Sequence, residues 1–175
     1  MSERAGRYER SFPGLIGAMV VLVLVVVGFV VFRDVGREEP VTSVEPVDYR
    51  EPARYARDQV DFVLLAPKDL PDGWVATSVR YSAGDEPSWH LGMLTKDRRY
   101  VGVEQERRAA SDMIDDFVDE DASRGDDVTV GGETWQTWTD SGDDTALVRQ
   151  TDAVTTVVVG AVPESTLASF VESGS

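Results

Sequence analysis

Residues 89–118 read WHLGMLTKDRRYVGVEQERRAASDMIDDFV, and this stretch decides the fold class. Two runs rich in apolar residues, 89–95 and 100–104, flank the polar segment KDRR, a pattern typical of a β-hairpin. Hydrophobic residues then recur at the spacing of a helix over 113–118. A hairpin that is followed by a helix predicts a domain of the α+β class.

The segments on either side extend this pattern to a whole domain. Further strands are expected at 60–65, 74–81, 128–130, 133–139, 146–149 and 154–162. Gly131 and Gly132 form a two-residue hairpin signal, and a closing helix is expected from Pro163 through Glu172. We therefore predict an antiparallel sheet with its helices packed on one face. Because each helix follows a strand pair, an alternative stays open in which a β-hairpin-plus-helix unit occurs twice.

The composition excludes several classes of function. The chain has 175 residues, a formal net charge of −15, one histidine and no cysteine. The absence of cysteine rules out disulfides, thiolate metal sites and a thiol nucleophile, and a single histidine rules out a multi-histidine metal site. Nucleic-acid binding needs a basic surface, so no nucleic-acid partner is expected. No cofactor is expected, since no glycine-rich phosphate-binding motif precedes a helix.

The segment 13–32 carries no charge and consists mostly of Val, Leu, Ile, Phe and Gly. A helix of about 20 such residues spans the ~30 Å hydrocarbon core of a bilayer. The sequence therefore predicts a cytoplasmic tail over 1–12, a single transmembrane helix over 13–32, a proline-containing spacer over 33–57 and an α+β domain over 58–175. More arginine before the span than after it favours a cytoplasmic N-terminus and a domain outside the cytoplasm.

Several motifs along the chain together resemble a known family: LPDGW at 70–74, WHLGMLT at 89–95, YVGVEQ at 100–105, VGGETW at 130–135 and ALVR at 146–149. The chain resembles the actinobacterial single-pass membrane proteins that are classed as domain of unknown function 4245, over roughly residues 12–172. The resemblance implies an N-terminal membrane anchor and an outward α+β domain. It implies no activity and no catalytic residues.

His90 is the only histidine and is therefore the first candidate for general-base chemistry. A hydrolase would pair it with Ser88 or Ser82 as the nucleophile and with Asp85 or Glu86 as the orienting acid. No Gly-x-Ser-x-Gly motif supports such a site. The simpler interpretation is a strand residue beside a core tryptophan, so no catalytic residue is predicted.

Other candidate binding groups are acidic or aromatic. The acidic run over 112–127 and the acidic turn over 140–144 carry oxygens that suit Ca²⁺ or Mg²⁺, but neither has the spacing of an EF-hand loop, so no metal ligand is predicted. Trp135 and Trp138 point to opposite faces of one strand, which leaves one ring as a candidate for a sugar- or protein-binding patch. The binding candidates are His90, Trp89, Trp138, Asp140, Asp143 and Asp144.

These observations favour a membrane-anchored, non-enzymatic protein that binds or assembles with an envelope protein or a cell-wall component. One alternative is a sensor of a small ligand or a divalent cation. Such a sensor would need a membrane partner, because the tail over 1–12 is too short to signal by itself. A second alternative is a hydrolase that uses His90.

Overall fold

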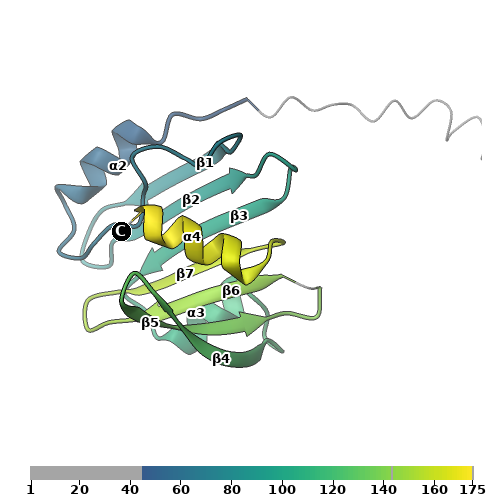
Figure 1. Ribbon diagram of the computed structural model, residues 1–175. Coiled ribbons are helices and arrows are strands. Elements are labelled where there is room, and N and C mark those ends of the chain that lie inside the picture. The colour runs from purple at the N-terminus through teal and green to yellow at the C-terminus, as the bar shows by residue number, and fades with distance from the viewer. Residues whose placement is uncertain (1–44, 143, 175) are drawn as a thin grey trace, which may run out of the picture. The chain divides into compact units, whose positions relative to one another are not determined.

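A seven-stranded sheet with helices on both of its faces makes up the domain in the structure, a computed structural model that describes residues 45–142 and 144–174 (Figure 1). The strand order is β1-β2-β3-β7-β6-β5-β4, and all neighbouring strands are antiparallel. The strands are β1 (Val75–Ser82), β2 (Ser88–Leu94), β3 (Tyr100–Glu106), β4 (Ser123–Val130), β5 (Glu133–Thr139), β6 (Thr145–Gln150) and β7 (Thr155–Gly160). The helices are α2 (Arg50–Arg57), α3 (Ala110–Phe117) and α4 (Glu164–Gly174). The predicted α+β class and antiparallel sheet are confirmed.

Two meanders build this sheet. The first is β1-β2-β3, the second is β4-β5-β6-β7, and β3 pairs with β7 where they meet. The helices α3 and α4 each follow a hairpin, β2-β3 and β6-β7, so the hairpin-plus-helix order does occur twice. Gly131 and Gly132 have φ angles of 61° and 84°, which are the positive values that a tight two-residue turn between β4 and β5 requires.

The prediction that the helices share one face is wrong. The helices α2 and α4 contribute to one core cluster, whereas α3 packs Met113 and Ile114 against Val157 and Val159 on the opposite side of the sheet. Figure 1 shows α4 in front of the sheet and α3 behind it. All residues of β7 are buried, because its apolar side chains alternate between the two sides and each side needs its own cover. We call the two sides the α4 face and the α3 face.

The strand predicted at 60–65 does not form. The segment is irregular, and the side-chain amide of Gln105 on β3 takes the place of a neighbouring strand. Its Oε1 accepts the backbone N–H of Leu65 at 2.7 Å, and its Nε2 donates to the Val63 carbonyl at 3.1 Å and to Thr156 Oγ1 at 2.9 Å. One buried amide therefore satisfies the backbone of an apolar run that has no ladder partner.

A β-bulge changes which residues of β1 share a face. Strict alternation along 74–81 predicts that Ala76, Ser78 and Arg80 lie on one side of the strand. The pairing with β2 instead slips between Ala76 and Ser78, which leaves Thr77 as an extra residue. Ala76 joins the core of the α4 face, and Ser78 points to the α3 face together with Arg80.

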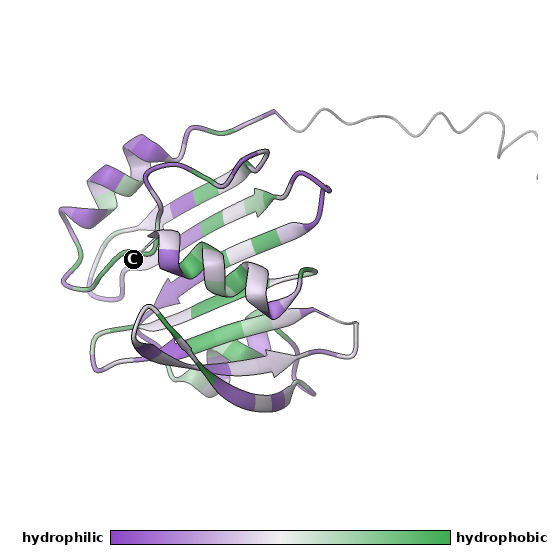
Figure 2. Cartoon of the chain, viewed as in Figure 1, coloured by the Kyte–Doolittle hydropathy of each residue, from purple (hydrophilic) through white to green (hydrophobic). Residues whose placement is uncertain are grey.

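The predicted tail over 1–12 and membrane span over 13–32 lie outside the described residues, as does the spacer through residue 44. Within the part of the chain that the structure describes, no helix is long and apolar enough to cross a bilayer. The end of the predicted spacer forms α2, which is largely hydrophilic in Figure 2. Its Ala53 and Ala56 pack into the core of the α4 face.

Candidate functional site

Three polar side chains on neighbouring strands form a continuous chain of hydrogen bonds on the α3 face. His90 of β2 lies directly opposite Glu104 of β3, and its Nδ1 is 2.5 Å from Glu104 Oε1. On the other side, His90 Nε2 is 2.8 Å from Ser78 Oγ of β1. The His90 and Glu104 side chains are 14% and 9% exposed, so the bonds are largely shielded from water. We call Ser78, His90 and Glu104 the serine relay.

The order of the atoms fixes what each group of the relay can do. An ionised carboxylate only accepts hydrogen bonds, so His90 Nδ1 carries the proton that Glu104 accepts. In the neutral ring, His90 Nε2 then has a free lone pair and accepts a hydrogen bond from the Ser78 hydroxyl. This Ser–His–acid order orients a histidine as a general base towards a serine.

Two glycines make room for this arrangement. Gly92 and Gly102 lie opposite each other in the β2-β3 pair. A Cβ atom at Gly92 would collide with Ser78 Oγ and would lie 3.3 Å from both His90 Nε2 and a ring carbon of Tyr100. A Cβ atom at Gly102 would meet the Tyr100 hydroxyl at 2.8 Å. The Tyr100 ring therefore covers the glycine pair beside the Ser78–His90 bond.

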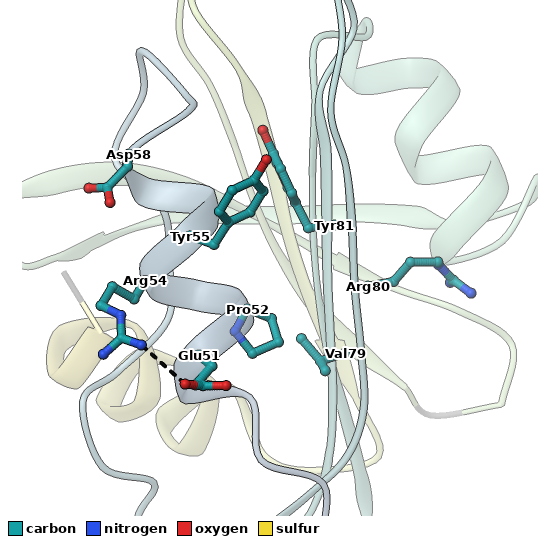
Figure 3. Close-up of a pocket in the computed structure, with 8 residues that line it drawn as sticks. All are labelled: Glu51, Pro52, Arg54, Tyr55, Asp58, Val79, Arg80 and Tyr81. Atoms are coloured by element: carbon teal, nitrogen blue, oxygen red, sulfur yellow. Dashed lines mark hydrogen bonds and ion pairs between the residues drawn. The ribbon is translucent and has the colours of Figure 1, made fainter.

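Tyr100 and Arg80 are polar neighbours of the relay. Burial raises the pKa of the Tyr100 phenol above its usual 10.0, the Glu104 carboxylate raises it further, and the positive charge of Arg80 partly lowers it. Tyr100 is therefore a neutral hydrogen-bond donor at physiological pH. Arg80 lies opposite His90 in the β1-β2 pair, and in Figure 3 its side chain points to the side of the strands away from α2.

The partners of His90 differ from those that the sequence suggested. Ser82 and Ser88 pair with each other at the far ends of β1 and β2. Asp85 and Glu86 are exposed in the loop between these strands. The structure gives the imidazole of His90 two other partners, one on each adjacent strand.

Sequence reasoning missed these partners, Ser78 and Glu104, for separate reasons. The bulge at Thr77 moves Ser78 to the face of His90, and no local sequence signal announces that shift. For Glu104 the turn length was the obstacle: the predicted turn over 96–99 places residue 105 opposite residue 90, whereas the observed connection over 95–99 places residue 104 there. The usable signal was the acidic residue itself, because an acidic residue within an otherwise apolar strand run usually has a polar partner.

The two tryptophan candidates are packing residues. Trp89 is 1% exposed within the core of the α4 face, where its indole N–H meets no acceptor among the described residues. Trp138 is half-buried against the cluster under α3 and donates its indole N–H to Gln136 Oε1 at 3.2 Å. Trp135 lies in the core of the α4 face, so Trp135 and Trp138 do point to opposite faces as predicted.

The acidic turn after β5 uses its first carboxylate for its own backbone. Asp140 Oδ1 accepts the N–H groups of Gly142 at 2.8 Å and of Asp144 at 2.7 Å. Burial, and then the charge of Asp140, raise the pKa of the Asp144 carboxyl. Asp143 lies outside the described residues. Across 45–142 and 144–174, no three or more acidic or histidine side chains gather as metal ligands would.

A trough of about 790 Å³ lies between α2 and β1 (Figure 3). Tyr55 of α2 and Tyr81 of β1 form its aromatic part, with ring centroids 5.9 Å apart and ring planes at 75°. Tyr55 is 58% exposed. On the helix side, Glu51 and Arg54 form an ion pair of 3.3 Å. The other residues of this α2–β1 trough are Pro52, Asp58, Val79 and Arg80.

The strand beside this trough is an edge of the sheet. At its beginning, the N–H of Val47 donates to the Ala76 carbonyl at 2.9 Å. Over 78–82, no backbone hydrogen bond from the described residues reaches its outer side. The opposite edge is β4, which carries the charged residues Arg124, Asp126 and Asp127.

The sequence model of one family, described as a protein of unknown function (DUF4245), matches residues 7–173. The chain belongs to this family. The family resemblance inferred from the motifs is thereby confirmed, whereas an actinobacterial origin and a single membrane span stay predictions.

No curated protein matches this member of the family. A solved structure, the crystal structure of MucB in complex with MucA(peri), matches at 17% sequence identity with a TM-score of 0.36. The match covers 65% of this chain and 36% of that chain, so this chain spans about a third of that protein's length. A similarity this low relates neither the folds nor the functions of the two proteins.

Proposed function

We propose that this chain is a single-pass membrane protein whose domain outside the cytoplasm binds a partner protein of the envelope. The partner adds an extended segment to strand β1. The observation that supports this function is the edge of β1 over 78–82, which pairs with no backbone of residues 45–142 or 144–174 on its outer side and lies next to the α2–β1 trough. An added strand gains main-chain hydrogen bonds along such an edge and places alternate side chains in the adjacent pocket. Binding alone accounts for this function, and it includes no reaction.

The two edges of the sheet differ in how they are protected. Proteins guard edge strands against unwanted pairing with charged side chains and with bulges. On β4 the bulge lies between Arg124 and Asp127, and charged residues surround it. On β1 the bulge lies at the beginning of the strand, and Arg80 is the single charged residue in VATSVRYS. The regular part of β1 is therefore the edge that is open to a partner.

The trough supplies the side-chain part of the interaction. Tyr55 and Tyr81 offer aromatic surface, and Val79 adds an apolar wall. The charges of Glu51 and Arg54 lie at the rim, where solvent still reaches them. An aromatic centre with a polar rim is the usual composition of a protein-binding surface. We therefore expect the partner segment to place an aromatic or aliphatic side chain against Tyr55.

Site-specific photo-crosslinking in cells tests this function. A benzophenone amino acid replaces Tyr55 in the full-length chain, and the control carries it at Thr129, an exposed residue of β4. We expect an adduct with a partner from position 55 and none from position 129. Mass spectrometry of the adduct identifies the partner segment, which is then synthesised as a peptide.

The peptide makes the test quantitative. It is expected to bind the purified full-length chain and to slow amide hydrogen exchange over 78–82. The substitution Tyr55→Asp should weaken binding by about tenfold or more, as loss of a central aromatic contact does. The control Val63→Asp changes another exposed apolar residue and should leave affinity unchanged. Equal adducts from both positions, no adduct, or an adduct with a second copy of this chain would each overturn the proposal.

A further inference from the structure

We propose that Ser78 is the nucleophile of an ester-hydrolysing site, with His90 as its general base and Glu104 as the residue that positions the imidazole ring. This activity goes beyond the binding function proposed above. It also rests on other groups: the relay uses side chains on the α3 face, whereas partner capture uses the outer backbone edge of β1 and the trough beside α2.

Two hydrogen bonds connect the three groups in the order that the reaction needs. Ser78 Oγ is 2.8 Å from His90 Nε2, and His90 Nδ1 is 2.5 Å from Glu104 Oε1. The paired strands hold all three side chains, so their positions do not depend on a mobile loop. The Glu104 side chain is 9% exposed, and its negative charge stabilises the imidazolium that forms when His90 takes a proton.

The α3 face gives a substrate access to Ser78. Ser78 is half-buried, and no helix among the described residues packs on this face of β1 and β2. Because a Cβ atom at Gly92 would fill the place where Ser78 Oγ lies, glycine is what lets the hydroxyl approach His90. The bulge at Thr77 turns Ser78 towards this face, and bulges often lie beside active sites for that reason.

Acylation begins when Ser78 Oγ attacks the carbonyl carbon of a carboxylic ester while its proton passes to His90 Nε2. The π electrons of the carbonyl move to its oxygen and give a tetrahedral intermediate. The bond to the alcohol oxygen then breaks, and the imidazolium returns the proton to the leaving alcohol. Water attacks the acyl-serine in the same way, with His90 taking its proton and giving it to Ser78 Oγ. No metal, redox partner or cofactor enters this balance.

Two side chains are placed to hold the negative oxygen of the intermediate. The Tyr100 ring lies beside the Ser78–His90 bond, and its phenol stays neutral and able to donate. Arg80 lies opposite His90 on the neighbouring strand and adds a positive charge to the same face. Donors aimed at the developing oxyanion supply the electrostatic stabilisation that backbone amides give in other hydrolases.

Covalent labelling of the full-length chain in detergent tests the proposal. An alkyl fluorophosphonate is expected to modify Ser78, as identified by mass spectrometry, and p-nitrophenyl acetate should be hydrolysed. Ser78→Ala should abolish both reactions, and His90→Ala should slow them by about 100-fold or more. The matched controls Ser88→Ala and Glu106→Gln keep the strand and the residue type, and should react at the rate of the unsubstituted chain.

A thiol version of the test works even if a relay variant is less stable. The chain has no cysteine, so Ser78→Cys introduces a single thiol whose alkylation by iodoacetamide is read without background. We expect this thiol to react faster than the one in Ser88→Cys, and to slow by about tenfold when His90→Ala or Glu104→Gln is added. The same additions should leave the reaction of Ser88→Cys unchanged, which separates positioning of His90 from general loss of structure.

The outcomes are decisive in both directions. Labelling of Ser78 that depends on His90 and Glu104 supports the site. Three results would overturn it: no labelling of Ser78, equal thiol rates at positions 78 and 88, or rates that His90→Ala does not change. Each would mean that the relay is a structural hydrogen-bond network. Partner capture at Tyr55 uses a separate measurement, so failure of this proposal leaves the proposed binding function standing, and the reverse holds as well.

Discussion

The α3 face of the sheet has two halves of opposite character. On β6 and β7 it is apolar and covered by α3, and its buried residues there are Ala146, Val148, Val157 and Val159. On β1 to β3 it carries Ser78, His90 and Glu104, and no helix among the described residues packs over β1 and β2. The border runs between Glu104 and Val157, which are direct register partners. The comparison teaches that the placement of one helix separates core from site on a continuous sheet.

The covered half also explains how the relay is shielded without a helix of its own. Val157 lies beside Glu104 at the border and is itself fully buried. Tyr100 covers the glycine pair on the other side of the relay. A carboxylate between such neighbours loses much of its hydration, so the hydrogen bond from His90 replaces contacts with water that the carboxylate has lost.

Removing the anchor of α3 should have the largest effect on stability. Met113 is fully buried under the helix, and Met113→Ala is expected to cost about 2–5 kcal/mol of unfolding free energy. Urea denaturation followed by circular dichroism measures the loss. Asp115→Ala, an exposed position of the same helix, should stay within about 0.5 kcal/mol. If Met113→Ala lost no more unfolding free energy than Asp115→Ala, α3 would not be needed to cover this half of the sheet.

Breaking the relay should cost less than uncovering the core. His90→Ala leaves the buried Glu104 carboxylate without its donor, and we expect a loss of about 1–3 kcal/mol. Adding Glu104→Leu to that variant should recover part of the loss, because the unpaired charge is then gone. Urea denaturation of both variants checks this, and a double variant less stable than His90→Ala would contradict it.

Filling the glycine gap should separate the relay from the fold. In Gly92→Ala the new methyl group displaces Ser78 Oγ, so the Ser78–His90 bond breaks while stability changes by no more than about 1 kcal/mol. The nitrogen-15 shifts of the His90 ring report that bond in solution. Gly84→Ala, where a Cβ atom would meet open space, serves as the spatial control, although its positive φ adds a small strain of its own. An unchanged ring signal in Gly92→Ala would disprove the packing argument.

The smallest expected effect is a change in stability at alkaline pH. The pKa of Tyr100 is raised in the folded state, so the unfolded chain releases that proton first as the pH rises past 10.0. The stabilising contribution is complete below pH 10.0 and is lost as the pH rises through the folded pKa. Tyr49, whose pKa is also raised by burial, acts in the same direction. Tyr100→Phe should therefore lose less stability between pH 9 and pH 11 in urea titrations; an identical loss would contradict the shift.

Local sequence patterns predicted most of the fold. The hairpin over 89–104, the glycine turn before β5 and the closing helix all follow from period and turn chemistry. The prediction of a strand at 60–65 was wrong because the side chain of the distant Gln105 hydrogen-bonds the backbone of that segment, and no local sequence pattern contains such a contact. The prediction that α3 shares a face with the other helices was wrong. Both sides of β7 are apolar, so hydrophobicity alone does not determine on which side of the sheet α3 packs.

The candidate site was predictable only in part. His90 stood out as the single histidine, but its partner Glu104 did not, because the predicted turn over 96–99 is one residue shorter than the observed connection. Ser78 required knowledge of a bulge, and the partners of His90 were instead sought in and beside the loop between β1 and β2, at Ser82, Asp85, Glu86 and Ser88. The trough beside β1 depends on where α2 packs. The short amphipathic run over 50–57 predicts a helix but not the strand against which that helix packs.

The extra residue in β1 makes the strand tolerant of a one-residue change in length. Deletion of Thr77 would place Ala76 and Ser78 in direct succession opposite Met93 and Gly92, which are already their partners. Ser78 and Arg80 would therefore stay on the α3 face, and Val79 and Tyr81 would stay on the α4 face. The loss of one codon at this position would thus leave the serine relay in place, because the ladder does not use the extra residue. Among relatives of this chain, the number of residues between the serine and the β1-β2 loop is therefore more diagnostic of the relay than its spacing from the Pro-Asp-Gly-Trp turn.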